Sequence, residues 1–198
     1  MRAERASKPT GEPLLDFLEV MRRLRAECAW KAGQTHRSLV RYLLEETHET
    51  IEAIESGDPD HLREELGDLL LQVYFHAVIA EEAGEFTIDD VAADIIAKMH
   101  RRNPHVFAPD ADSPTDAAGI DAAWQRIKAE EKQRTSIADG LPPTLPALLY
   151  ADKVLGRLDH VPAPDDDLGG RLLALVIEAR EQGVDPEQAL RDAVRGLL

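Results

Sequence analysis

The sequence predicts an all-α fold, a helical bundle built on an antiparallel hairpin of two helices. Three observations predict it. Apolar residues recur every three or four positions along most of the chain, as they do on one face of a helix. Glycine, proline and capping residues bound these runs at positions typical of helix ends. The alternation of apolar and polar residues that marks a strand is nearly absent.

The hairpin occupies the middle of the sequence. Its first helix begins at Ser38, a candidate N-cap, and stops at Gly57. Its second helix begins with Asp58 as N-cap and Pro59 in the first turn, and it runs to Gly84. Because only two residues separate the helices, the chain must fold back on itself at this point.

Carboxylates from the two helices are expected to lie level across the hairpin. With a rise of about 1.5 Å per residue, Glu49 and Glu65 lie roughly 10–12 Å from the turn, and Glu46 and Asp68 lie one turn further out. Like charges this close repel each other unless a cation lies between them. Together with Glu45, these carboxylates favour an oxygen-ligand site for Mg²⁺ or Mn²⁺. The other interpretation of the same pattern is a solvated acidic face.

The second helix of the hairpin is apolar almost all round between Leu66 and Ile79, which predicts that it is largely buried. One line of polar residues runs through it. That line comprises His61, Glu65, Asp68, Gln72 and His76.

The composition excludes several classes of protein. The 198 residues carry a formal net charge of −15, which argues against binding a nucleic-acid polymer or an anionic membrane. The single cysteine excludes a disulfide within the chain and fits a reducing compartment. We find no signal peptide and no membrane-spanning run, so a cytoplasmic location is expected.

The segments before the hairpin are a polar tail and a helix. Residues 1–13 are interpreted as a disordered tail, and residues 14–28 as an amphipathic helix. The loop that follows carries Trp30 and His36, which either shape a ligand pocket or cover the core.

A third helix, from Thr87 to Arg102, ends in a basic cluster. Lys98, Arg101 and Arg102 lie in its last turn and a half. These cations either complement the helix dipole or bind a polyphosphate. The second role fits because an otherwise acidic chain can hold a polyphosphate only at a local basic cluster.

A fourth helix, about residues 120–134, carries Trp124 and Lys128 on one face. Trp124 either stacks on a nucleobase or anchors the helix. Further helices are predicted over residues 144–158, 168–182 and 186–197.

An internal similarity relates the hairpin to the end of the chain. The segment LGDLLL from Leu66 aligns with LGGRLL from Leu168, which places Asp167 on Glu65 and Gly170 on Asp68. No counterpart of the first hairpin helix stands upstream. The alignment therefore predicts a C-terminal repeat that keeps its apolar frame and has lost its ligands.

Four segments together resemble the MazG nucleoside triphosphate pyrophosphohydrolases: LLEETHETIEAI, HLREELGDLLLQVYFHAVIAEE, KMHRRNPHVF and WQRIKAEEK. The resemblance implies a catalytic domain of the all-α NTP pyrophosphatase type over residues 14–134. Residues 135–198 resemble a shortened, degenerate second MazG repeat. The implied reaction is hydrolysis of NTPs or dNTPs, standard or damaged, to the monophosphate and pyrophosphate in a nucleotide-pool housecleaning role. The implied cofactor is Mg²⁺, with Mn²⁺ as an alternative ion.

The resemblance also implies roles for individual residues. Glu45 would orient or deprotonate the attacking water. The metal ligands would be Glu46, Glu49, Glu65 and Asp68. The triphosphate would be held by Lys98 and Arg102 with Arg101 nearby, and Trp124, Lys128, Trp30 and His36 would lie beside the nucleotide.

Two other functions fit the residues less well. A di-iron carboxylate bundle needs two Glu-x-x-His motifs, and the hairpin offers only the one from Glu45 to His48. A non-catalytic helical interaction module would leave the carboxylates solvated. In either case the apolar second helix needs more cover than one chain offers, which predicts a homodimer or a dimer of dimers.

Overall fold

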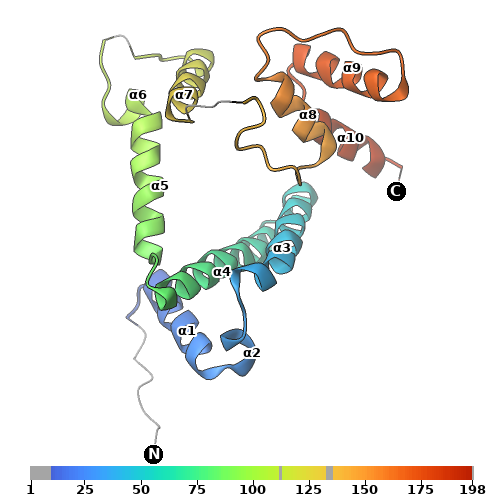
Figure 1. Cartoon of the computed structure of the whole chain (residues 1–198). Helices are drawn as coiled ribbons and strands as arrows, with labels where there is room; N and C mark the ends of the chain where they lie inside the picture. The colour runs from blue at the N-terminus through green and yellow to red at the C-terminus, as the bar shows by residue number, and fades with distance from the viewer. Residues whose placement is uncertain (1–9, 112, 133–135, 198) are drawn as a thin grey trace, which may run out of the picture. The chain divides into compact units, whose positions relative to one another are not determined.

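The structure, a computed structural model, describes residues 10–111, 113–132 and 136–197, and its regular elements within these ranges are all helices (Figure 1). The predicted all-α class is confirmed. The chain divides into two compact units, Met1–Ser113 and Pro114–Leu198. The sequence places a boundary at residues 134 and 135 instead, which lie outside the described residues. The difference concerns α7 (Ala117–Lys132), which the division places in the second unit.

The first unit is a set of helices around one long hairpin. Helices α3 (His36–Ser56) and α4 (Pro59–Ala83) lie side by side and antiparallel (Figure 1). Helix α1 (Pro13–Glu27) packs on α4, and α5 (Ile88–Arg102) leaves from the end of α4 opposite the hairpin turn. Two further helices of this unit are single turns, α2 (Ala29–Ala32) and α6 (Pro104–Phe107). Helix α2 lies in the segment that the sequence predicts as a loop.

Local chemistry fixes the turn of the hairpin as predicted. Gly57 has a left-handed backbone with φ of 72°, and the side chain of Asp58 accepts hydrogen bonds from the backbone N–H groups of Asp60 and His61. The predicted start of α3 is wrong by one turn. Thr35 is the N-cap, and Ser38 is the third residue of a reciprocal capping box, with Thr35 N donating to Ser38 Oγ over 2.9 Å.

The hydrophobic core lies between α1 and α4, beside the start of α3. Tyr74 packs there, and its hydroxyl donates a hydrogen bond to the Leu14 carbonyl. The prediction that α4 is largely buried is only partly correct, because Leu66 is 51% and Val73 is 44% exposed. Helices α1 and α3 cover two sides of α4 and leave these residues uncovered. The buried core residues are Leu18, Met21, Leu39, Tyr74, Phe75 and Val78.

Arg25 joins three segments of the first unit. Its guanidinium pairs with the Glu82 carboxylate near the end of α4 and donates to the backbone carbonyls of Lys31 and Gln34. The hydrogen bond from Arg25 lowers the pKa of Glu82. Since these carbonyls precede α3, Arg25 holds the connection that delivers His36 to the hairpin.

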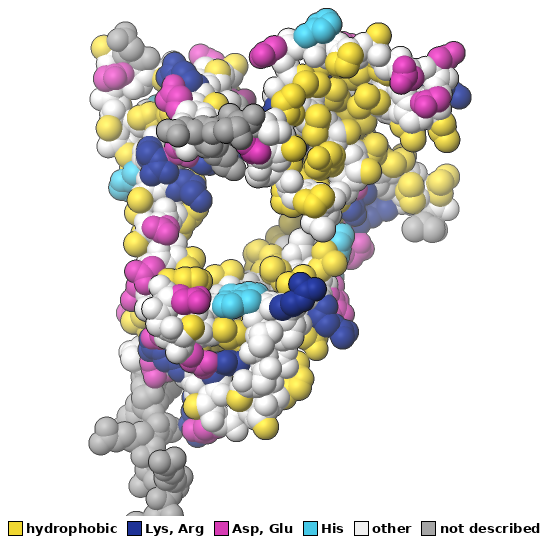
Figure 2. Space-filling view, in the orientation of Figure 1, with side chains coloured by type: hydrophobic (Ala, Val, Ile, Leu, Met, Phe, Trp, Pro, Cys, Tyr) yellow, Lys and Arg dark blue, Asp and Glu magenta, His cyan; other side chains and the backbone are white. Residues whose placement is uncertain are grey.

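The second unit consists of α7 and three further helices that pack on one another, α8 (Ala147–Leu155), α9 (Leu168–Glu181) and α10 (Pro186–Arg195). The three predicted helices beyond residue 140 are present with shorter ends. Hydrophobic side chains gather over α8, α9 and α10 (Figure 2). Across the described residues of both units, the helices are too short or too polar to cross a membrane.

Candidate metal centre

Three carboxylates meet between α3 and α4. Glu46, Glu49 and Glu65 each place a ligand atom within 4.8 Å of the others, as the level spacing across the hairpin predicts. Glu46 and Glu49 share one face of α3 because they are three residues apart. Glu65 is only 9% exposed, whereas Glu49 is exposed, so the cluster is closed toward α4 and open to solvent beyond α3.

Small and polar residues bring the two helices together beneath the cluster. Thr50 is buried, and its hydroxyl donates to the Glu46 carbonyl over 2.8 Å and lies 3.5 Å from the Glu65 carbonyl. Ala53, one turn further along α3, is fully buried. Because neither residue is bulky, the backbones of α3 and α4 can lie close and the carboxylates face each other.

The negative charges in the cluster oppose one another. The pKa of Glu46 is raised, first by burial and then by the charges of Asp68, Glu49 and Glu65. Asp68 is therefore electrostatically part of the site, although it lies outside the tight group of three. A cation bound among these groups would remove the repulsion that raises the pKa of Glu46.

The two carboxylate oxygens of Glu65 differ in their contacts. Its Oε1 lies 3.3 Å from His61 Nε2, and its Oε2 is buried without a hydrogen-bond partner among the described residues. An unpartnered carboxylate oxygen facing two other carboxylates is the donor set that suits a hard divalent ion. The residues present therefore fit Mg²⁺ or Mn²⁺.

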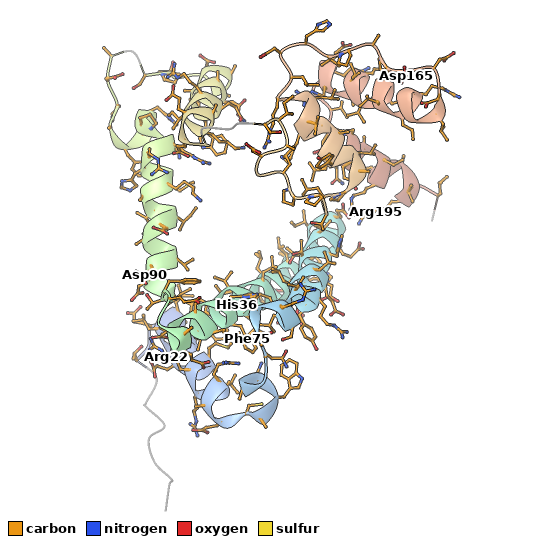
Figure 3. All side chains as sticks on the ribbon, in the orientation of Figure 1. Arg22, His36, Phe75, Asp90, Asp165 and Arg195 are labelled. Atoms are coloured by element: carbon orange, nitrogen blue, oxygen red, sulfur yellow. The ribbon has the colours of Figure 1, made fainter. Side chains whose placement is uncertain are left out.

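The remaining predicted site residues before α4 lie outside the tight group. Glu45 is exposed and, as the neighbour of Glu46, is turned about 100° away around α3. Trp30 is 51% exposed, with its ring edge-on to Tyr42. His36 lies at the start of α3 beside α4 (Figure 3), more than two turns from Glu46.

The basic residues of α5 are not brought to the carboxylates within the first unit. Arg102 is buried, Arg101 is exposed and Lys98 is half-buried, all near the end of α5 directed away from the hairpin (Figure 1). Trp124 and Lys128 lie on α7 of the second unit, with the Lys128 ammonium 4.9 Å from the Trp124 ring centroid. Their predicted contacts with nucleotide stay predictions.

The structure adds two residues to the predicted set, Gln72 and His76. Both lie on α4, and each has a buried polar atom without a partner in the described part of the chain. The signal in the sequence is the polar line through an apolar helix. The sequence does not show which members of that line are buried without partners.

The fold and this site define an all-α protein with a candidate divalent-metal centre between two antiparallel helices. Residues 34–107, which span α3 to α6 and contain the carboxylate cluster, match the family model described as the MazG nucleotide pyrophosphohydrolase domain. With the relatives that match over most of the chain, this shows that the chain belongs to the MazG nucleotide pyrophosphohydrolase family.

Three relatives match over most of this chain. The chain is 37% identical to the nucleoside triphosphate pyrophosphohydrolase/pyrophosphatase MazG of Thermotoga maritima, over 95% of this chain and 84% of that protein. It is 47% identical to an uncharacterized 26.1 kDa protein of Streptomyces cacaoi, over 92% of this chain and 78% of that protein. It is 45% identical to the nucleoside triphosphate pyrophosphohydrolase of Mycobacterium tuberculosis, but spans only 55% of that relative's length.

Proposed function

We propose that this protein hydrolyses nucleoside triphosphates, NTPs or dNTPs including damaged ones, to the monophosphate and pyrophosphate. The observation that carries the proposal is the group of three carboxylates within 4.8 Å of one another, in the segment that matches the family. Facing carboxylates in a strongly acidic chain attract a divalent cation, and a cation is what a triphosphate needs there.

We propose Mg²⁺ as the cofactor, with Mn²⁺ as an alternative ion. Glu46, Glu49 and Glu65 would hold it, with Asp68 as the fourth ligand. When bound, the ion neutralises phosphate charge and lowers the pKa of a coordinated water. Glu45 lies beside this group on the exposed side of α3, from where it is proposed to orient or deprotonate the attacking water.

The basic end of α5 is proposed to hold the triphosphate. Lys98 and Arg102 offer positive charge in a chain whose net charge is −15, and positive charge stabilises a leaving pyrophosphate. Because α5 points away from the hairpin, its basic residues do not reach the carboxylates of the hairpin within the first unit. We propose that they come together when the protein closes on its substrate, or that a second copy of the chain supplies them. The exposed Leu66 and Val73 favour a homodimer or dimer of dimers.

The two alternative functions have less support. In the di-iron interpretation, Glu45 and His48 would be ligands, but both are exposed and neither joins the cluster. In the interaction-module interpretation, the carboxylates would be solvated, whereas Glu65 is buried and one of its oxygens has no partner among the residues described.

Product analysis tests the proposal. The full chain is incubated with Mg²⁺ and a panel of standard, deoxy and damaged nucleoside triphosphates, and the products are separated. We expect equimolar monophosphate and pyrophosphate, and no turnover when a chelator removes the metal. Release of orthophosphate and nucleoside diphosphate, or turnover unaffected by the chelator, would overturn it.

A further inference from the structure

Beyond the carboxylate cluster, α4 carries two further polar side chains in a region that is otherwise apolar. Gln72 is 4% exposed, and its Oε1 is buried without a partner in the part of the chain that the structure describes. His76 lies one turn further along, and its Nε2 is also buried without a partner among the described residues. Burying a polar group without a hydrogen bond is costly, so each such atom in a native structure calls for a ligand or another explanation.

These side chains lie on the same face of α4 as the carboxylate. Gln72 is seven residues and His76 eleven residues beyond Glu65, which correspond to two and three helical turns. The stripe faces α3, because Glu65 meets the α3 carboxylates at one end and His76 meets His36 of α3 at the other. With a rise of about 1.5 Å per residue, Gln72 lies roughly 10 Å from Glu65 along the helix.

The contact between His36 and His76 does not satisfy His76. The two Nδ1 atoms are 2.7 Å apart, so one ring must donate to the other. If His36 donates, the proton of His76 is on Nε2, a buried donor without an acceptor. If His76 donates, its Nε2 is a buried acceptor without a donor. Burial and the neighbouring His36 both lower the pKa of His76, which favours this neutral ring.

We propose that Gln72 and His76 read the hydrogen-bonding edge of the nucleobase, with the triphosphate at the carboxylates and the sugar between them. This assignment rests on the proposed function. An amide and a neutral imidazole suit an uncharged ring that carries donors and acceptors side by side. The separation of Gln72 from Glu65 matches the reach of a nucleotide from its phosphates to its base.

The role of Gln72 predicts a change in base preference. In Gln72→Met, a side chain of similar size without hydrogen-bonding groups, we expect kcat/KM for the preferred dNTP to fall about tenfold. The ratios among dATP, dGTP, dCTP and dTTP should flatten. Inhibition by inorganic tripolyphosphate, which has no base, should keep its wild-type value.

The matched control is Tyr74→Phe. Tyr74 is buried on the same helix, but its hydroxyl bonds the Leu14 carbonyl on the opposite side, toward α1. This variant should lose stability and keep the wild-type ratios. Gln72→Leu provides a second apolar replacement if the methionine variant does not fold, as judged by circular dichroism.

The outcomes separate the two proposals. A wild-type protein that turns over no nucleotide refutes the proposed function and this assignment with it. A wild-type protein that releases pyrophosphate, with unchanged base ratios in a folded Gln72 variant, refutes the assignment alone. Flattened ratios with unchanged tripolyphosphate inhibition support it.

Discussion

Helices α4 and α9 share an apolar frame but begin at different points relative to it. In α4 the first residue is Pro59, so Glu65 projects from well inside the helix into the carboxylate cluster. In α9 the first residue is Leu168, and Asp167, the counterpart of Glu65, is the N-cap. Its carboxylate accepts a hydrogen bond of 2.7 Å from Gly170 N. In the internal alignment that the sequence predicts, the position of a candidate ligand within α4 therefore corresponds to the N-cap of α9.

The helices that face α4 and α9 differ in charge pairing. Across from α4, α3 presents the carboxylates of Glu46 and Glu49, and one Glu65 oxygen has no partner within the described ranges. Across from α9, the short α8 presents Asp152, which forms an ion pair with Arg180 of α9. The acidic group between α8 and α9 is neutralised within the chain, whereas the acidic group between α3 and α4 calls for a cation from outside.

Gly170, the counterpart of Asp68, cannot accept a side chain without a change in the backbone. A Cβ atom there would lie 1.9 Å from the Asp165 carbonyl oxygen and 2.6 Å from its carbon. The chain before α9 thus occupies the space that a fourth ligand would need. In the predicted repeat, the position that corresponds to Asp68 therefore has no room for a ligand side chain.

The largest expected effect is the loss of turnover when a proposed metal ligand of the hairpin is replaced. Glu49→Gln should lower turnover by more than about 100-fold, because a proposed metal ligand is weakened, while removing one repelling charge leaves the apo fold intact. Asp167→Asn is the matched control in the repeat, and it should leave kcat/KM at the wild-type value. Comparable losses in both variants, measured by pyrophosphate release, would show that the repeat contributes to catalysis.

The second effect tests whether the basic residues at the end of α5 bind the triphosphate. Lys98→Ala should lower kcat/KM roughly tenfold to 100-fold through lost stabilisation of the developing phosphate charge. Arg101 is turned about 100° from its neighbour Arg102 and is exposed, so Arg101→Ala should change kcat/KM much less. Equal, small effects in steady-state kinetics would leave the cluster with a helix-dipole role only.

The third effect compares the exposed apolar faces of the two helices. We expect light scattering to give twice the chain mass or a multiple of it. Val73→Glu on α4 should reduce that mass, because it places a charge on the face proposed to pack against a second copy. Leu175→Glu is the parallel change on α9, where Leu175 is 61% exposed. If only the α9 variant dissociates, the dimer forms through the repeat.

Local sequence signals predicted the hairpin well. The turn depends on Gly57, Asp58 and Pro59, whose preferences act within a few residues, so it needs no knowledge of the rest of the chain. The start of α3 was misplaced because Thr35 and Ser38 are both good caps, and they act together as a capping box. Single-turn helices such as α2 are too short to show a periodic pattern.

The candidate site was predictable only where it lies within the hairpin. The spacing of Glu46, Glu49 and Glu65 in two connected helices fixes their meeting. The place of Lys98 depends on the direction in which α5 leaves α4, a tertiary property that no local spacing encodes. The importance of Gln72 and His76 depends on which polar atoms are buried without partners, and burial follows from packing.

The smallest effect contrasts two carboxylates of the first unit whose pKa values move in opposite directions. The pKa of Glu46 is raised by burial and like charges, whereas that of Glu82 is lowered by its hydrogen bond to Arg25. A carboxylate with a lowered folded-state pKa stabilises the fold above its ordinary pKa, and this stabilisation is lost as the pH falls through the lowered value. Because the Glu82 side chain is 46% exposed, its pairing contributes less than about 1 kcal/mol.

The test is chemical denaturation of wild type and Glu82→Gln between neutral and acidic pH. The variant should be slightly less stable at pH 7, and the difference should shrink toward zero as the pH falls through the lowered folded-state pKa of Glu82, below which the carboxylate is protonated in both states. Glu27→Gln is the control, because Glu27 pairs with Arg23 on its own helix with 63% of its side chain exposed. A Glu82→Gln variant as stable as wild type at pH 7 would mean that Arg25 holds the connection before α3 without help from the Glu82 charge.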